Sequence, residues 1–301
     1  MKHCTVDLDG PVHYADFGGS GPPIVLVHGL GGSHLNWLAV APGLARRGRV
    51  LAVDLAGFGR TPSGGRSARI GNNRRLMDRF LEDVAREPAV LVGNSMGGYL
   101  ALAEAAAEPR KVASLVLVSP AVPLAPGARI DPRVFALFLG TSLPLVGRML
   151  MRLRARRGPE IAVRDMLALC CVDSSRIGRE IFDAHVELAR ERAPRGALAR
   201  RDFLEAQRSL LWRLVRRRRF LEMVRSIEAP ALIVQGERDR LVRLEAARAL
   251  ASSRPDWRFV VLDDVGHVPQ LEAPERFLAE VEAWLDLNSR SRGPSAPGPP
   301  A

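Results

Sequence analysis

The fold is decided at Val90 to Leu100, where the sequence is VLVGNSMGGYL. An aliphatic run leads into Gly93-Asn94-Ser95-Met96-Gly97, and a helical pattern of small residues follows. One interpretation is a strand that ends in an ordinary glycine turn. The other is a nucleophile elbow, in which the Gly-x-Ser-x-Gly spacing turns the chain so tightly from strand to helix that the Ser95 side chain stands above a sheet.

The composition allows one large α/β domain or two smaller ones, because 47% of the 301 residues are apolar. The three cysteines, Cys4, Cys170 and Cys171, give neither a disulfide framework nor zinc-ligand spacing. The N-terminal stretch MKHCTVDLDG lacks the apolar core of a secretory signal, so we expect a cytoplasmic protein. The uncharged run from Val134 to Gly147 is too short and too broken by glycine and proline to span a bilayer.

The net charge of +11 is concentrated in one segment, since Ala121 to Glu228 holds 22 arginines against 12 acidic residues. No nucleic-acid-binding module or interleaved aromatic pattern accompanies this charge, so we expect no nucleic-acid partner. A solvated basic face is the simpler interpretation. An anionic membrane surface or an acyl carrier protein is the alternative partner of this segment.

Aliphatic runs alternate with helical patterns over the first 120 residues, which is typical of a parallel sheet with crossover helices. Asp9-Gly10 predicts a hairpin turn, and therefore an antiparallel edge pair, before the parallel part begins. The predicted strands are Ile24–Val27, Val50–Leu55, Val90–Val92, Leu115–Val118, Ala231–Val234 and Arg258–Leu262. The predicted helices of the core are Leu35–Arg46, Arg74–Arg86, Gly97–Ala107, Leu244–Ala251 and Pro274–Leu287.

A helical insertion interrupts the predicted sheet. We expect a core of residues 1–120 and 226–287, a helical lid of residues 121–225, and a disordered tail at 288–301, which is rich in proline, glycine and serine. An insertion after a parallel strand lies above the edge where such sheets bind ligands.

A serine hydroxyl is a weak nucleophile, so Ser95 needs a base and the base needs an orienting acid. His267 lies in a loop just beyond the last predicted strand, which is where the elbow motif places its base. Of the other five histidines, His3 is terminal, His13 lies in the early hairpin, and His185 lies in a helix. His28 and His34 flank a glycine loop.

The orienting acid is expected at a strand end between serine and histidine. Asp239 meets this condition, and Glu237 is its competitor. An acid at such a place can also be only a helix cap. The order Ser95, Asp239, His267 is the one that the elbow motif predicts.

Negative charge that develops on a substrate oxygen needs hydrogen-bond donors. We expect one from the backbone N–H of Met96 and the second from the loop VLVHGLGGS, Val25 to Ser33, with Leu30 as the donor. His28 then braces this loop by hydrogen bonds.

These motifs resemble those of the α/β-hydrolase superfamily over residues 25 to 290. The resemblance rests on His28-Gly29, DLAGFGRT (Asp54–Thr61), GNSMGG (Gly93–Gly98), GERDRLV (Gly236–Val242) and GHVPQLEAPERF (Gly266–Phe277). It implies an eight-stranded, mostly parallel sheet, a helical lid over the active site, and hydrolysis through an acyl-enzyme without cofactor or metal.

Ser95 argues against the family members that cleave carbon–halogen bonds or epoxides, which use aspartate at this position. We expect a carboxylesterase or lipase-like enzyme with a medium-chain or longer acyl substrate. The alternatives are a carbon–carbon bond hydrolase of a vinylogous diketone ring-fission product and, from another class, a non-catalytic ligand-binding protein.

The lid contains an apolar span, Val134 to Met151, next to a cluster of arginines. We expect its apolar residues to pack on the core and line the pocket. The alternative is an apolar lip with a basic rim that rests on an anionic membrane.

Overall fold

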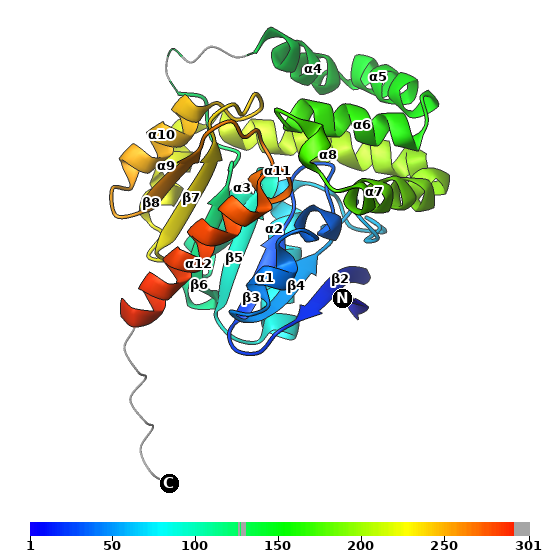
Figure 1. Cartoon of the computed structure of the whole chain (residues 1–301). Coiled ribbons are helices and arrows are strands. Elements are labelled where there is room, and N and C mark those ends of the chain that lie inside the picture. The colour runs from blue at the N-terminus through cyan, green and yellow to red at the C-terminus, as the bar shows by residue number, and fades with distance from the viewer. Residues whose placement is uncertain (126, 128–130, 292–301) are drawn as a thin grey trace.

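One eight-stranded sheet organises the computed structural model, which describes residues 1–125, 127 and 131–291 (Figure 1). Its strands are β1 (Lys2–Asp7), β2 (Pro11–Gly18), β3 (Pro23–Val27), β4 (Arg49–Val53), β5 (Ala89–Asn94), β6 (Val112–Val118), β7 (Ala231–Gly236) and β8 (Arg258–Leu262). Their order across the sheet is β1-β2-β4-β3-β5-β6-β7-β8. The pairs β1·β2 and β2·β4 are antiparallel and the other neighbours are parallel, which confirms the predicted fold class and edge hairpin.

Alternating side chains of the central strands pack into two hydrophobic cores, one on each face of the sheet. Val25 and Val27 of β3 belong to the core that includes residues of α2 and α3, whereas Ile24 and Leu26 belong to the core that includes residues of α1 and α12. Burial on both faces explains why these strands are continuous aliphatic runs.

Helices cover both faces of the sheet and one end of it. The core helices are α1 (Ala41–Leu44), α2 (Ile70–Phe80), α3 (Met96–Ala107), α10 (Leu244–Ser253), α11 (Pro269–Glu272) and α12 (Pro274–Ser291). Short turns of helix are η1 (His34–Trp37), η2 (Leu81–Ala85), η3 (Pro109–Lys111), η4 (Ser174–Arg176) and η5 (Ala193–Arg195). The helix predicted over 35–46 is in fact two pieces, η1 and α1, because Pro42 begins a new helix at α1.

The described residues between β6 and β7 form helices and no strand. These helices are α4 (Pro132–Ser142), α5 (Pro144–Arg156), α6 (Pro159–Cys170), α7 (Arg179–Arg192), α8 (Gly196–Leu214) and α9 (Arg217–Arg225). In Figure 1, α4 to α8 gather beyond one end of the strands. α9 instead packs on the core, where the Phe220 ring stacks on Tyr99 of α3 with centroids 6.1 Å apart. We keep the division into core and lid at residues 121 and 225 as a proposal.

The tail begins later than we expected. α12 continues to Ser291, so residues 288–291 are helical, and residues 292–301 lie outside the described residues. Residues 288–291 contain neither glycine nor proline, and extending an existing helix requires fixing only one more residue per added hydrogen bond.

The apolar span of the lid is exposed, which contradicts the expectation that it packs on the core. Six of its large side chains are at least one third exposed, namely Phe135, Leu139, Leu143, Leu145, Val146 and Met149. Among the described residues no single helix is long and apolar enough to cross a bilayer, and α4 and α5, which together reach that length and composition, are bent by 116° at their junction.

Candidate active site

Ser95 occupies a strained turn between β5 and α3. Its backbone angles are φ 53° and ψ −114°, a region in which a residue with a side chain costs roughly 1–3 kcal/mol. The end of β6 holds the turn, since the Ser95 N–H donates to Val118 O over 3.0 Å and Ser95 O accepts from the N–H of Ala121 over 2.9 Å. This geometry is that of the predicted elbow rather than of an ordinary glycine turn.

The two glycines of the motif allow close backbone approach. A Cβ on Gly93 would lie 2.4 Å from Gly97 O, and a Cβ on Gly97 would lie 2.1 Å from Val27 O of β3. Neither position has room for a side chain without backbone movement, so the Gly-x-Ser-x-Gly spacing follows from packing of β5, α3 and β3.

His267 and Asp239 meet at the carboxyl ends of β7 and β8. His267 Nδ1 lies 2.7 Å from Asp239 Oδ2, and both side chains are buried. Asp239 Oδ1 accepts the N–H groups of Leu241 and Val242 over 2.8 and 2.9 Å, so the carboxylate is held as an acceptor. Nδ1 therefore carries the proton, and Nε2 keeps its lone pair for a base.

Glu237, the competing acid, points elsewhere. Its Oε2 accepts the Asp264 N–H over 3.4 Å at the surface. The structure thus brings Asp239, and not Glu237, to the predicted base.

The link between Ser95 and His267 runs through Asn94. The Asn94 side-chain amide donates to Val118 O and to His267 O, each over 3.1 Å. In the described part of the chain no hydrogen bond joins Ser95 Oγ to the His267 ring, and such bonds often tighten only when substrate is bound. Asn94 lies inside the motif at Gly93 to Gly97 but was not among the predicted site residues.

The loop that carries Leu30 passes next to Ser95, and Met96 follows Ser95 directly in the chain. A Cβ on Gly29 would lie 3.2 Å from Ser95 Cβ, so the loop after β3 runs directly past the nucleophile. Among the described residues, neither the N–H of Leu30 nor that of Met96 donates to a protein acceptor. Both amides are therefore available to an oxygen of a bound molecule.

His28 braces this loop as predicted. Its Nδ1 donates to Gly29 O over 2.7 Å, and its Nε2 accepts the Leu55 N–H over 3.1 Å. Full burial lowers the pKa of His28 to about 4, so the ring stays neutral and its two hydrogen bonds persist at neutral pH.

Two contacts from the lid reach the loop that carries His267, and sequence reasoning missed both. The His267 N–H donates to Cys170 O over 2.6 Å at the end of α6. Buried Glu272 accepts the N–H groups of Val172 and Asp173 through Oε1 and that of Gly266 through Oε2. The only available sequence signal was the position of Glu272 within the GHVPQLEAPERF motif.

Comparison with known proteins identifies the family of the chain. The model of the alpha/beta hydrolase fold family matches residues 22–274. The chain is 31% identical to a 2-hydroxy-6-oxononadienedioate/2-hydroxy-6-oxononatrienedioate hydrolase of Paraburkholderia phymatum, over 88% of each protein. It is 30% identical to a pimeloyl-(acyl-carrier protein) methyl ester esterase of Aeromonas hydrophila, over 89% of this chain and 96% of that protein.

A solved structure of a membrane phospholipase A is also similar, with a TM-score of 0.75 and 29% identity, over 96% of this chain and 86% of that one. The family match covers most of the chain, and the relatives are hydrolases and esterases that are similar over nearly their whole length. The chain therefore belongs to the alpha/beta hydrolase fold family and is an enzyme of the hydrolase class.

Proposed function

We propose that this enzyme is a serine hydrolase in which Ser95 attacks a carbonyl carbon, His267 transfers the proton and Asp239 orients the ring. The observation that carries the proposal is the 2.7 Å contact between His267 and Asp239 at the edge of the sheet where the elbow presents Ser95. The amides of Leu30 and Met96 hold the oxygen that becomes negative in the tetrahedral intermediate. Water then releases the acyl group from Ser95.

The first substrate class that we propose is a diketone whose carbon–carbon bond lies beside a carbonyl. The support is the relative named for 2-hydroxy-6-oxononadienedioate hydrolysis, so this alternative moves ahead of the acyl ester that we first expected. Ser95 Oγ bonds to the carbonyl carbon as its proton passes to His267, and collapse of the tetrahedral intermediate then breaks the adjacent carbon–carbon bond. The electron pair of that bond leaves with the conjugated fragment as an enolate, which takes the proton from His267, and water converts the acyl-enzyme into the acid.

The second class is an ester of an apolar acyl chain, cleaved at an anionic membrane surface. Its support is α5, which presents Leu145, Met149 and Leu153 between Arg148, Arg152 and Arg156 on one exposed stripe. A membrane phospholipase A is among the similar structures. Each arginine near an anionic surface contributes about 1 kcal/mol to binding.

A substrate comparison separates the two classes. Purified enzyme is assayed with a 2-hydroxy-6-oxo-dienoate and with a series of p-nitrophenyl acyl esters of increasing chain length, each with and without anionic vesicles. A kcat/KM at least tenfold higher for the diketone supports the first class. A preference for long acyl esters that vesicles increase supports the second.

The Ser95→Ala variant tests the mechanism that both classes share. It should lose turnover of every substrate and labelling by a fluorophosphonate, with an unchanged circular dichroism spectrum. If Ser95→Ala retained turnover, Ser95 would not be the nucleophile. Absence of labelling and turnover in the wild-type enzyme would mean that neither proposed substrate class is cleaved through Ser95.

We propose a reducing compartment, the cytoplasm, as the place of action. The support is that Cys4, Cys170 and Cys171 are all free thiols. Burial raises the pKa of Cys170 to about 12, which keeps this thiol protonated and unreactive.

A further inference from the structure

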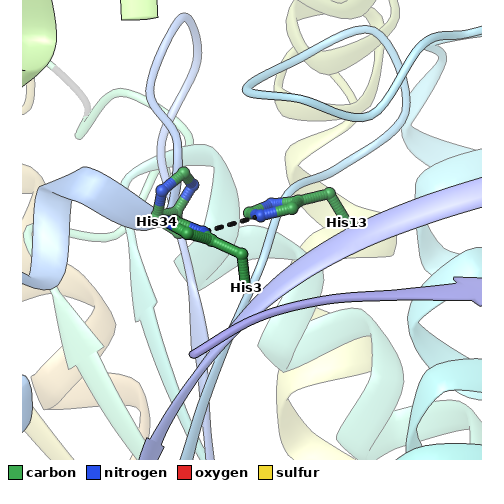
Figure 2. A group of neighbouring side chains, drawn as sticks. All are labelled: His3, His13 and His34. Carbon is green, nitrogen blue, oxygen red and sulfur yellow. Dashed lines mark hydrogen bonds between the residues drawn. The ribbon is translucent and has the colours of Figure 1, made fainter. Parts of the chain in front are cut away.

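Three histidines that are distant in the sequence converge on one point, as Figure 2 shows for His3 of β1, His13 of β2 and His34 of η1. His3 Nδ1 lies 3.0 Å from His13 Nε2, and one ring nitrogen from each of the three lies within 4.8 Å of the others. His13 and His34 are buried, and His3 is exposed at the edge of the sheet. The triad does not use this cluster.

Asp54 fixes the protonation of the two buried rings. His13 Nδ1 lies 2.8 Å from Asp54 Oδ2, and His34 Nδ1 lies 3.0 Å from the same oxygen. Because the carboxylate accepts both Nδ1–H groups, each Nε2 is left with a lone pair. A carboxylate behind a histidine is the usual outer-sphere partner of a metal-bound imidazole.

His34 supplies an independent observation. Its Nε2 is buried and has no hydrogen-bond partner among the described residues, although the side chain is only 1% exposed. A buried polar atom without a hydrogen-bond partner is unfavourable unless a ligand binds to it.

Arg60 is the cation that faces the cluster. Its Nη1 lies 3.1 Å from both ring nitrogens of His3, while its Nε and Nη2 donate to Glu191 over 2.9 and 2.8 Å. Glu191 therefore balances its charge. The Arg60 side chain is 35% exposed, so it can move away from His3 into solvent.

We propose that His3, His13 and His34 bind one divalent transition-metal ion, with zinc as the first choice, and that Asp54 supports His13 and His34 from behind. Neutral imidazole nitrogens suit zinc, copper and nickel, and three histidines leave a fourth tetrahedral position for water on the exposed side of His3. The ion links the edge hairpin to the loop after β3 that carries Leu30. Its role is structural, because none of its ligands belongs to the triad. The expectation of no metal rested on cysteine spacing, which contains no information about histidines joined by strand pairing.

The test uses the full-length protein, treated with a chelator and freed of it by gel filtration. Equilibrium dialysis against micromolar Zn²⁺ should give about one ion per chain at pH 7.5, with a higher melting temperature. Co²⁺ should bind at the same stoichiometry with the intense visible absorption of a tetrahedral complex.

Variants assign the ligands. His3→Gln changes an exposed residue at the sheet edge, so it keeps the fold and should weaken zinc binding roughly tenfold or more. His34→Gln should do the same and should change the Co²⁺ spectrum. His185→Gln is the matched control, because its ring lies on α7 and contacts Ile181 O.

Two results would overturn the proposal. One is a wild-type protein that takes up no Zn²⁺ or Co²⁺ in the dialysis. The other is uptake that His3→Gln leaves unchanged, or that His185→Gln lowers equally, since the ion would then lie elsewhere. If His34→Gln does not fold, the uptake and the Co²⁺ spectrum of His3→Gln decide the question.

Discussion

The side-chain amide of Asn94 donates to the main-chain carbonyl of His267 over 3.1 Å, and thereby joins the last residue of β5 to the loop after β8. The same amide also contacts Val118 O of β6. The residue next to the proposed nucleophile thus contacts the residue proposed as the base, although the two are 173 residues apart in the sequence.

Asn94→Ala should therefore uncouple the two loops. We expect kcat to fall by about 10²-fold, because a displacement of about 1 Å between reacting groups costs this much. KM should change little, since Asn94 is not proposed to contact substrate. Steady-state kinetics of Asn94→Ala and the wild type measure both constants. An unaltered kcat would mean that other contacts suffice to place His267.

Asp239→Asn should lower kcat by about 10⁴-fold, because an amide favours the wrong tautomer of His267. Glu237→Gln is the matched control and should retain wild-type activity, since this side chain accepts only the surface N–H of Asp264. Equal losses in the two variants would show that the acid has been assigned incorrectly.

Glu272→Gln should destabilise the protein. Its two carboxylate oxygens accept three backbone N–H groups, and an amide NH2 would face at least one of them. A buried unsatisfied donor costs about 1–3 kcal/mol, which should appear as a lower urea midpoint. Glu275→Gln, at an exposed position of α12, serves as the control and should leave the midpoint unchanged.

Glu104 should make stability depend on pH. Burial raises its pKa to about 7 from an ordinary 4.5, although Arg74 donates to Oε2 over 3.0 Å. The native state thus favours the protonated acid, so the stability from this group is complete below pH 4.5 and is lost as the pH rises through 7. The shift corresponds to about 3 kcal/mol in the free energy of unfolding.

Glu104→Gln mimics the protonated acid, so its stability should not fall in this way as the pH rises. Urea unfolding at about pH 4.5 and pH 8.5 should show the variant gaining about 3 kcal/mol relative to the wild type. Glu228→Gln, which changes an exposed carboxylate, should show the same change in the free energy of unfolding between the two pH values as the wild type. An equal change in Glu104→Gln and the wild type would contradict the assigned pKa of Glu104.

The exposed stripe on α5 should bind anionic vesicles. Leu145 and Met149 are 74% and 54% exposed, and replacing both with serine removes apolar area worth about 1.5–3 kcal/mol for each side chain that inserts fully. Sedimentation with phosphatidylglycerol vesicles should show affinity reduced tenfold or more. Leu287→Ser, at an exposed site on α12, should bind as the wild type does. If the wild-type protein did not sediment with the vesicles, the proposed contact of α5 with an anionic membrane would be wrong.

Much of the core was predictable because its elements are local in the sequence. The run from Val90 to Val92 is aliphatic since both faces of β5 are buried, and Gly93 and Gly97 are glycines since a Cβ would strike neighbouring backbone. The same reasoning located Asp239 and His267 at strand ends. The single helix predicted over 35–46 was wrong, because η1 ends at Trp37 and a new helix, with Pro42 in its first turn, begins at Ala41. The predicted packing of the lid's apolar span on the core was also wrong, because apolar spacing does not say which surface covers a helix.

The sequence by itself determined the alternation of buried strands and helices, the elbow at Ser95 and the order of the proposed catalytic side chains, because each is encoded by neighbouring residues or by a strand end. Only the tertiary structure decided that Asn94 and Glu272 hold the His267 loop, that α5 is exposed, and that His3, His13 and His34 meet around Asp54. The physical reason is that these contacts depend on strand pairing and helix docking between distant segments, and local hydrophobic periodicity does not specify which distant segments meet.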